Sequence, residues 1–440
     1  MTTSSITIGS PWAPYGLRDD PYFQQALQPR TGDEAARPAS LHVGRLEERT
    51  LLANQIVGAT SSRAIIQGEA GVGKTSFVSW LKTALTEHDV LTHEAPVRVQ
   101  AGMGAREFIG EVLKVLLQIR ATQVAARAAG DLPGSRARLP ARTESAEEAA
   151  FWVRLNRLVD GEDSIAGGAT PAAFGMQQER IRIPAELQAS LFTELEQALD
   201  YLAEGGARRI LIHVNNMEGL QGPEARAAAD LMQQVRDAFL FDHGHWLFVG
   251  TTGIEQDIFR VHPQVGGIIP LSITLDPLTP SEVRALLEKR YTHLRNGFRF
   301  TPPVAAADAE ALYARYRGHL RDFLRLLSGA VQRHAVTAPG TSLNAEDVVR
   351  TMAATYAAGL TSRIPRDDAQ ALAATLAGYP YDSEFRVTDI EQRAKATQAL
   401  ASRLVSRLLD RGVIHESRRR GRSVYYQVSH GDDTVALGLL

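Results

Sequence analysis

Short apolar runs alternate with longer amphipathic stretches from about residue 41 to residue 278. Each apolar run has the length of a strand, and the stretches between them have the periodicity of helices. This order is typical of a parallel sheet with crossover helices, and so of an α/β fold. The expected strands are Ala64–Gln67, Pro96–Gln100, Arg209–Val214, His245–Thr251 and Leu271–Leu275.

A helical region is predicted after the last of these strands. Thr279 suits an N-cap, Pro280 suits the first helical position, and Glu282 completes a capping box. A later helix in "RGHLRDFLRLLSGAV" repeats its apolar positions at helical spacing. The side chains expected to face inward from these helices are Val283, Leu286, Leu287, Leu320, Phe323, Leu324 and Leu327.

The pattern after residue 387 predicts a winged helix-turn-helix. Its second helix, residues 398–411, has an apolar stripe, and Gly412 suits the position after a helix. Two short strands, "VIHES" and "SVYYQV", flank the turn "RRRGR". The leucines expected to be buried by the helix are Leu400, Leu404, Leu408 and Leu409.

This C-terminal region carries the candidate DNA-binding residues. Gln398, Ser402 and Arg403 lie near the start of the second helix, where they would face a major groove. Arginines at a hairpin tip suit contacts with a phosphate backbone, and the tip holds Arg418, Arg419, Arg420 and Arg422. Winged helices also bind proteins, so a packing module is the alternative.

Two segments interrupt the regular pattern. Residues 1–40 hold five prolines among polar residues and are expected to form an extended arm. Residues from about 120 to 185, rich in Gly, Pro and Arg, are expected to be an insertion of part helix and part loop. Its arginines, Arg136 and Arg138 among them, either contact DNA or a partner or belong to a solvated loop.

The expected organisation is therefore an arm at 1–40, a nucleotide-binding domain at 41–278, a helical lid at 279–336 and a winged helix domain at 337–440. The chain of 440 residues, 44% hydrophobic and 22% charged, is long enough for about three domains.

The net charge of the chain, −2, requires any nucleic-acid surface to be a local patch. The absence of cysteine excludes disulfides and thiolate zinc sites. With no signal peptide and no apolar run near the ~20 residues of a membrane span, a cytoplasmic protein is expected, with no membrane partner.

The stretch "AIIQGEAGVGKTSF" fits the phosphate-binding loop pattern, between an apolar strand and an amphipathic helix. Its glycines let backbone amides turn toward phosphates, and the helix N-terminus adds a favourable dipole. Lys74 would reach the β- and γ-phosphates of ATP, and the Thr75 hydroxyl would be a ligand of Mg²⁺. The residues expected to hold the nucleotide here are Gly68, Gly71, Gly73, Lys74, Thr75 and Ser76.

A second apolar strand, "ILIHVNN", ends at a position where phosphate-loop NTPases carry acids that manage Mg²⁺ and the attacking water. This chain has Asn215 and Asn216 there, whose amides bring no negative charge and accept no proton. Glu218, two residues further on, reaches the site if the loop bends. Asn215, Asn216 and Glu218 are the candidate catalytic positions.

Together these motifs resemble the AAA+ ATPases of the origin-recognition and archaeal replication-initiator type, and relatives such as transposon target-selection ATPases. The likeness runs from about residue 41 to the C-terminus. "HVGRLEER" is similar to the family's leading motif, which implies that Val43, Gly44 and Arg45 lie beside the adenine. "LFVGTTG" is similar to the strand with the first sensor, which implies that Thr251 or Thr252 lies near the γ-phosphate and makes Thr252 a further candidate catalytic residue.

"RGHLRDFLRLL" is similar to the second-sensor helix, which puts Arg321 in the place of the sensor arginine. The chain departs from the family twice. The usual acidic pair is Asn215–Asn216, and Gly266–Gly267 stands where relatives carry an arginine finger, with Arg260 the nearest candidate. Because a finger contributes several orders of magnitude in rate where it acts, both departures favour weak or absent hydrolysis.

The leading functional hypothesis is an ATP-controlled protein that binds double-stranded DNA, associates with itself and recruits a further protein partner. The alternative is a signal-transducing NTPase that regulates transcription or a defence effector, with the winged helix as a protein-binding module. An ordinary ATP-hydrolysing motor is a third possibility, which the two asparagines argue against.

Overall fold

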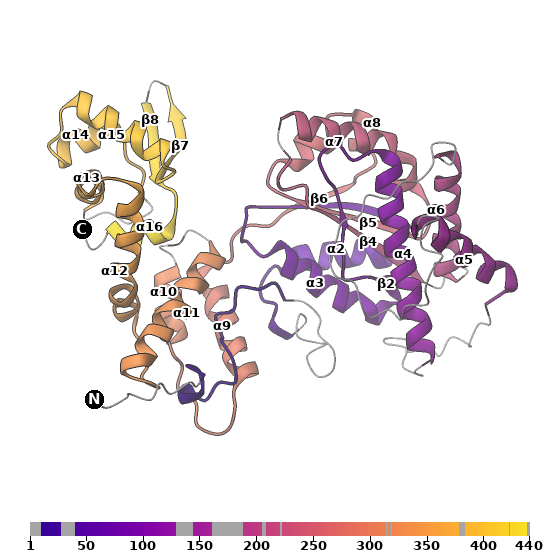
Figure 1. Ribbon diagram of the computed structural model, residues 1–440, viewed down its shortest axis with the longest axis horizontal. Coiled ribbons are helices and arrows are strands. Elements are labelled where there is room, and N and C mark those ends of the chain that lie inside the picture. The colour runs from indigo at the N-terminus through magenta and orange to yellow at the C-terminus, as the bar shows by residue number, and fades with distance from the viewer. Residues whose placement is uncertain are drawn as a thin grey trace, which may run out of the picture. The chain divides into compact units, whose positions relative to one another are not determined.

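The computed structural model describes residues 10–27, 40–128, 144–160, 188–204, 208–220, 222–313, 316, 319–377, 383–421 and 423–437. Its contacts divide the chain into two compact units (Figure 1). Unit 1 comprises Met1–Ala26, Ala70–Gly73 and Pro277–Leu440, and unit 2 comprises Leu27–Glu69 and Lys74–Asp276. Arg136, Arg138 and Arg422 lie outside the described residues.

Unit 2 is built on a parallel sheet. Its strands are β1 (Ser62–Gln67), β2 (Val90–Thr92), β3 (Val97–Arg98), β4 (Arg209–Asn215), β5 (Gly244–Gly250) and β6 (Leu271–Thr274). They lie in the order β2-β4-β5-β1-β6, with β3 also paired to β4, and every pairing is parallel. The five expected strands are present, and the α/β prediction is confirmed. The sequence pattern missed β2, a strand of three residues.

Helices cover both faces of this sheet. Successive side chains of a strand point to opposite faces, and those of β1 and β5 are mostly buried on both, so each face needs a layer of helices. Ile65 of β1 belongs to an apolar cluster with residues of α4, α6 and α7. On the opposite side of the strand, α2 packs against β1 and α3. The helices are α2 (Leu46–Gly58), α3 (Lys74–Leu85), α4 (Ala105–Ala128), α5 (Ala146–Asp160), α6 (Gln188–Ala203), α7 (Pro223–Gln234) and α8 (Pro263–Gly266), with short helical turns η3 (Thr86–His88), η6 (Arg236–Leu240) and η7 (Glu255–Phe259).

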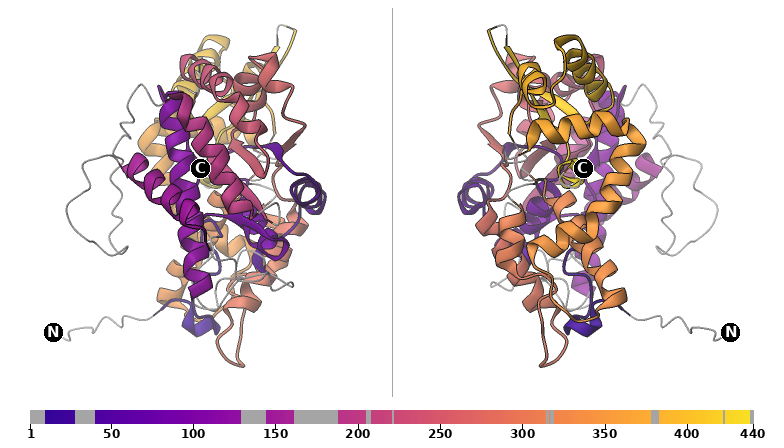
Figure 2. Two further views of the ribbon diagram at one scale, coloured as in Figure 1. Left: turned by 90° about the vertical axis from the view of Figure 1, so that its right-hand side faces the viewer. Right: turned by 90° about the vertical axis from the view of Figure 1, so that its left-hand side faces the viewer.

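The predicted insertion is helical where it is described. The end of α4 and the whole of α5 fall within it, and α6 follows it. The helices α4 and α6 run side by side, as Figure 2 shows, and α5 packs against α4. Phe151, Trp152 and Tyr201 form a cluster of edge-on and tilted rings between α5 and α6. This region therefore extends the core of unit 2.

Unit 1 is mostly helical. It contains α9 (Pro280–Leu294), α10 (Ala306–Tyr313), α11 (Leu320–Thr337), α12 (Ala345–Arg363), α13 (Arg366–Leu376), α14 (Val387–Arg393), α15 (Gln398–Asp410) and α16 (Gly431–Leu437), the strands β7 (Ile414–Arg420) and β8 (Ser423–Val428), and the turn η1 (Ala13–Tyr15). The predicted capping box is present, because the Thr279 hydroxyl accepts from the Glu282 amide and the Glu282 carboxylate accepts from the Thr279 amide.

The described residues before Leu27 are packed rather than extended. Trp12, Tyr15 and Tyr22 are buried. The Tyr22 and Tyr291 hydroxyls lie 2.7 Å apart, and the Arg290 guanidinium donates to the Pro21 carbonyl at 3.0 Å. The expectation of an extended arm therefore does not hold here, because aromatic residues between the prolines pack against α9.

Helices α14 and α15 and the antiparallel hairpin β7–β8 form the expected winged helix (Figure 1). Helix α15 buries Leu404 and Leu408 as expected. Leu400 and Leu409 are 55% and 38% exposed, which corrects the expectation that they are buried. The buried stripe of α15 is Ala401, Leu404, Val405 and Leu408, and the other two leucines lie at its margins.

The core of unit 2 contains buried histidines that make it sensitive to acid. The His245 Nδ1 lies 2.8 Å from the Ser62 hydroxyl, and burial, followed by the charges of Arg209 and Arg63, lowers the pKa of His245 to about 3. Burial also holds the pKa of His213 on β4 well below its ordinary value. Neutral imidazoles are therefore required inside this fold.

We expect unit 2 to lose stability as the pH falls below 6.5. The unfolded chain binds a proton at His245 near pH 6.5 and the folded chain does not, so the free energy of unfolding falls by about 1.4 kcal/mol per pH unit, or about 2 kcal/mol by pH 5. Urea unfolding followed by tryptophan fluorescence measures this loss. In His245→Gln, unfolding should take up about one proton fewer, so the free energy of unfolding should fall less steeply as the pH is lowered. If its slope against pH is unchanged, His245 is not the source of this loss.

Candidate functional site

The predicted phosphate-binding loop joins β1 to α3 at the carboxyl edge of the sheet, where open α/β sheets bind ligands. Gly71 and Gly73 have φ of +85° and +96°, a backbone conformation that favours glycine. Helix α3 begins at Lys74 and is 12 residues long, so its N-terminal amides point into the loop region. The local structure is therefore that of an anion-binding turn.

The Lys74 ammonium is buried within unit 2 and fully hydrogen-bonded. It donates to the Gly68 carbonyl at 2.8 Å and to the Glu69 carbonyl at 3.0 Å. Its third contact is an ion pair with the Glu218 carboxylate at 2.9 Å. Since an ammonium has three N–H groups, a phosphate that binds Lys74 has to replace one of these partners.

Glu218 is the partner that can leave most easily. Its side chain is 47% exposed, whereas that of Lys74 is 5% exposed. The loop after β4 therefore bends far enough to bring an acid to the base of the phosphate loop. This contact meets the condition under which the sequence makes Glu218 a candidate.

Asn215 and Asn216 lie at the carboxyl end of β4. The Asn215 carbonyl accepts from the Val99 amide at 3.0 Å, which continues the β3–β4 pairing. Asn216 has φ of +71°, and its side-chain amide donates to the Val99 carbonyl at 2.9 Å. The Asn216 side chain is thus used to hold the strand end beside β3.

The turn after β5 carries the two candidate sensor threonines. Gln67 and Gly250 are paired in register, so this turn lies next to the start of the phosphate loop. The Gln67 side chain accepts from the Gly253 amide at 3.0 Å and donates to the Thr274 hydroxyl at 3.2 Å. Thr252 is exposed in that turn, and Thr251 is half-buried. Gln67, which sequence reasoning missed, therefore fixes this turn between β5 and β6.

The predicted adenine-side residues lie just before α2. Val43 is buried, Gly44 has φ of +68°, and Arg45 has φ of +56° as the N-cap of α2. The Arg45 guanidinium donates to the Asp276 carbonyl at 3.0 Å, which ties this segment to the chain after β6. On the first turns of α3, Thr75 is exposed and the Ser76 hydroxyl accepts from the Leu27 amide at 3.2 Å.

The two arginines that bear on the resemblance have different surroundings. Arg321 lies on the first turn of α11 in unit 1, and a side chain at Gly71, in the same unit, would meet its Cβ at 3.8 Å. Arg260 is held by Glu255 through contacts of 3.0 and 2.8 Å. A hydrogen bond from Ser272 and the pairing with Arg260 lower the pKa of Glu255, so this ion pair persists at neutral pH.

The wing arginines differ in how they are paired. Arg418 contacts the Glu384 carboxylate at 2.6 Å and lies 4.6 Å from the Tyr425 ring centroid. Arg419 pairs with Glu416 at 3.0 Å. Arg420 is exposed at the end of β7. The tip is therefore cationic, but two of its charges are already partly neutralised.

The start of α15 presents a polar surface. Gln398, Ser402 and Arg403 are all exposed, and the Thr397 hydroxyl caps the helix by accepting from the Leu400 amide. Helix α15 is also held by the two contacts of 2.7 Å that the Arg407 guanidinium, one turn after Arg403, makes with the Asp368 carboxylate. The predicted groove-facing residues thus share a solvent-facing surface on a fixed helix.

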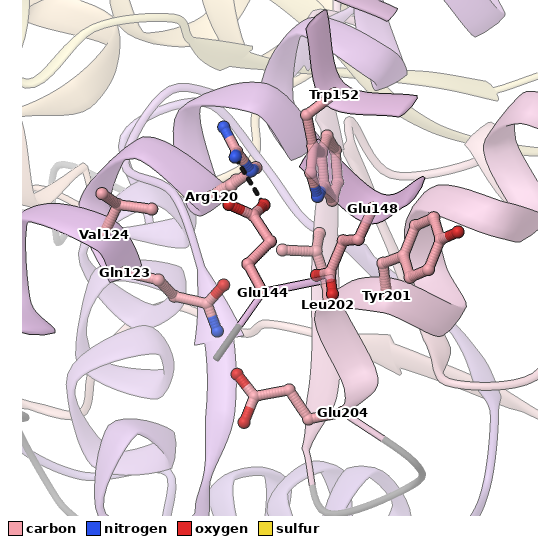
Figure 3. A pocket seen from close by; sticks show the side chains of 9 residues that line it. All are labelled: Arg120, Gln123, Val124, Glu144, Glu148, Trp152, Tyr201, Leu202 and Glu204. Carbon is pink, nitrogen blue, oxygen red and sulfur yellow. Dashed lines mark hydrogen bonds and ion pairs between the residues drawn. The ribbon is translucent and has the colours of Figure 1, made fainter. Parts of the chain in front are cut away.

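Unit 2 also has a small pocket between α4, α5 and α6 (Figure 3). Arg120 closes one side by an ion pair of 2.6 Å with Glu144, and its guanidinium lies 5.1 Å from the Trp152 ring centroid. Gln123 and Glu204 line the pocket as well. None of its lining residues belongs to the phosphate loop. Among the described residues, no group of three or more His, Cys, Asp or Glu side chains is arranged to hold a metal ion.

Comparisons with known proteins identify similar solved structures. No protein-family model and no curated protein matches the chain. The structure of the Aeropyrum pernix Orc1 protein in complex with DNA covers 98% of this chain and 96% of its own, at 15% identity and a TM-score of 0.41. The A. pernix Orc2 protein in its ADPNP–ADP complexes covers 96% and 97%, at 14% identity and a TM-score of 0.45.

The Cdc6p structure from Pyrobaculum aerophilum covers 96% of each chain, at 13% identity and a TM-score of 0.39. The described part of the chain contains no helix that meets the length and hydropathy needed to cross a membrane.

Proposed function

We propose that the protein binds ATP at the phosphate loop and double-stranded DNA through the winged helix, and that nucleotide occupancy controls an assembled or DNA-competent form. The observation that carries the proposal is the buried Lys74 ammonium at the end of a two-glycine anion turn. Its ion-pair partner is the exposed Glu218 carboxylate, whose place a phosphate oxygen takes with the same charge-assisted bonding.

The residues of unit 2 fit a nucleotide's phosphates. Lys74 would neutralise phosphate charge, the first amides of α3 would bind phosphate oxygens, and the exposed Thr75 hydroxyl would be a ligand of Mg²⁺. Bound Mg²⁺ would supply charge neutralisation at the phosphates. Val43, Gly44 and Arg45 are proposed for the adenine side, with Thr252 near the terminal phosphate.

Hydrolysis is proposed to be slow. Asn215 and Asn216 bring no charge to the strand end, and the Asn216 side chain is already bonded to the Val99 carbonyl. Glu218 is the acid that lies near Lys74, and its carboxylate is engaged in an ion pair with that ammonium. ATP would then act by binding the assembled or DNA-competent form more tightly than the other form, which raises the population of that form.

The winged helix is proposed to supply the DNA contacts. Arg418 and Arg420 are two residues apart on β7 and share a face of the hairpin, since side chains alternate along a strand. Gln398, Ser402 and Arg403 would face the major groove while the wing arginines contact phosphates. Self-association on DNA and an unidentified protein partner belong to the same proposal.

The salt dependence of DNA binding tests this function. Arg418→Ala with Arg420→Ala should lower the slope of log K against log salt by about 1.8, at ~0.9 for each phosphate contact. Fluorescence anisotropy of a labelled 30-base-pair duplex, read with and without ATP, measures it. The matched control is Arg419→Ala, whose side chain lies on the other face of the hairpin from Arg418 and Arg420 and which should change the slope by less than about 0.9.

Two outcomes would count against the proposal. A double variant with an unchanged slope would place the DNA surface elsewhere, the arginines near Arg136 and Arg138 being the next to test. Wild-type protein that binds no duplex, with or without ATP, would favour the winged helix as a protein-binding module in a signal-transducing NTPase.

A further inference from the structure

The loop between α9 and α10 presents a fully exposed aromatic ring. Phe298 is 109% exposed, the highest value among the large apolar side chains that the structure describes. Figure 1 shows the loop projecting from the helices of unit 1, at the end of the unit away from β7 and β8. Arg295 and Arg299 flank the ring and are exposed as well.

This loop is held in place by backbone hydrogen bonds to the N-terminal segment. The Arg18 amide donates to the Leu294 carbonyl at 2.9 Å, and the Asn296 amide donates to the Gly16 carbonyl at 2.9 Å. On the returning side, the Thr301 amide donates to the Tyr15 carbonyl at 3.1 Å. Both arms of the loop are therefore attached to one buried segment, and the Phe298 ring is presented on a fixed base.

Two glycines make this arrangement possible. Gly16 has φ of +75°, and a Cβ there would lie 1.9 Å from the Arg299 carbonyl oxygen, so no other residue allows this approach. Gly297, with φ of +94°, forms the turn immediately before Phe298. The loop is thus a specific local structure rather than an arbitrary connection.

The charge around the ring is positive. The Arg295 guanidinium lies 4.4 Å from the Phe300 ring centroid, and the Arg18 guanidinium contacts the His293 ring nitrogen at 3.1 Å. Residues 291–307 contain no Asp or Glu. In the N-terminal segment that holds the loop, residues 10–18 contain none either, and the first acid is Asp19. An exposed aromatic ring between arginines fits a polyanion that also offers flat aromatic faces.

We propose that this loop is a second DNA contact, in which Phe298 stacks on an unstacked base while Arg295 and Arg299 contact the flanking phosphates. The inference rests on the proposed DNA-binding function and adds a preference for distorted or unpaired DNA. Stacking of bases on aromatic side chains tolerates any sequence, and apolar wedges also enter opened base steps in duplexes.

Binding of the full chain to two DNA probes tests the inference. One probe is a 30-base-pair duplex, and the other is the same duplex with three central mismatches and a 2-aminopurine among them. Phe298→Ala should weaken binding to the mismatched probe about tenfold, the lower part of the range for one stacked base, and leave the paired duplex within about twofold. It should also abolish the change in 2-aminopurine fluorescence.

Val336→Ala is the matched control, because Val336 is an 83% exposed apolar residue of the same unit. It should alter neither probe, and neither exposed substitution should affect folding. Phe298→Leu should keep part of the affinity if the side chain acts as a wedge.

The inference is overturned if Phe298→Ala binds the mismatched probe as wild type does while the Arg418 and Arg420 variant weakens duplex binding; the proposed function then stands. It is also overturned if Phe298→Ala leaves both DNA affinities intact and instead abolishes binding to phosphatidylserine vesicles. Wild-type protein that binds neither probe refutes the proposed function and this inference together.

Discussion

Lys74→Ala is expected to abolish nucleotide binding. The ammonium is the buried cation at the end of the phosphate loop, and its loss removes charge-assisted contacts to the phosphates. We expect the affinity for Mg·ATP to fall at least about 100-fold, which corresponds to ~2.7 kcal/mol at 25 °C. Isothermal titration or a fluorescent ATP analogue measures this effect.

The ion pair with Glu218 makes the same experiment more specific. Because the Glu218 carboxylate competes with phosphate for Lys74, Glu218→Gln should strengthen ATP binding several-fold, opposite in direction to Lys74→Ala. Lys114→Ala, on α4 with a half-exposed ion pair to Glu111, is the control and should bind ATP as wild type does. Wild-type affinity in the Lys74→Ala protein would place the nucleotide elsewhere.

Slow turnover is the second large effect that we expect. Steady-state phosphate release with saturating DNA should be below about 0.01 per second, at least 100-fold under the lower end of the usual range for enzymes. The physical reason is that the neutral amides of Asn215 and Asn216 neither anchor the metal shell nor accept a proton from water. Asn215→Asp with Asn216→Glu should raise the rate. The expected lack of an arginine finger at Gly266–Gly267 would limit that gain.

A wild-type rate of about 1 per second or faster would contradict this expectation. Glu218→Gln then identifies the source: loss of that rate assigns the acid to Glu218, and a retained rate assigns it to a partner subunit. ATP affinity measured on the same variant separates a defect in chemistry from a defect in binding, because that substitution is expected to bind ATP more tightly.

The elements that follow from local pattern were predictable. Five strands of unit 2, the phosphate loop and the capping box at Thr279 depend on hydrophobic period and on the residues of turns and caps. The strand β2 was missed because Val90–Thr92 is three residues long, too short to show a period. Leu400 and Leu409 lie one residue outside the buried stripe of α15, and the apolar character of leucine alone does not distinguish these margins from the core.

The contacts that decide the site's chemistry were less predictable, since they join residues far apart in sequence. The Glu218–Lys74 pair depends on the bend after β4, and the direction of the Asn216 side chain depends on its positive φ. Arg418 was expected to be available to DNA, but it pairs with Glu384, which no periodicity connects to the wing. Contacts of this kind require the three-dimensional structure.

The packing of Tyr22 against Tyr291 has a consequence for the order in which the protein forms during synthesis. The two residues are 269 positions apart, and all of unit 2 is made between them. At about 5 to 20 residues per second, the ribosome takes about 15 to 50 seconds to supply the partner of Tyr22. The first aromatic side chains of the nascent chain, Trp12, Tyr15 and Tyr22, therefore wait exposed while unit 2 folds, and they are the segment of the newborn protein that chaperones would be expected to bind first.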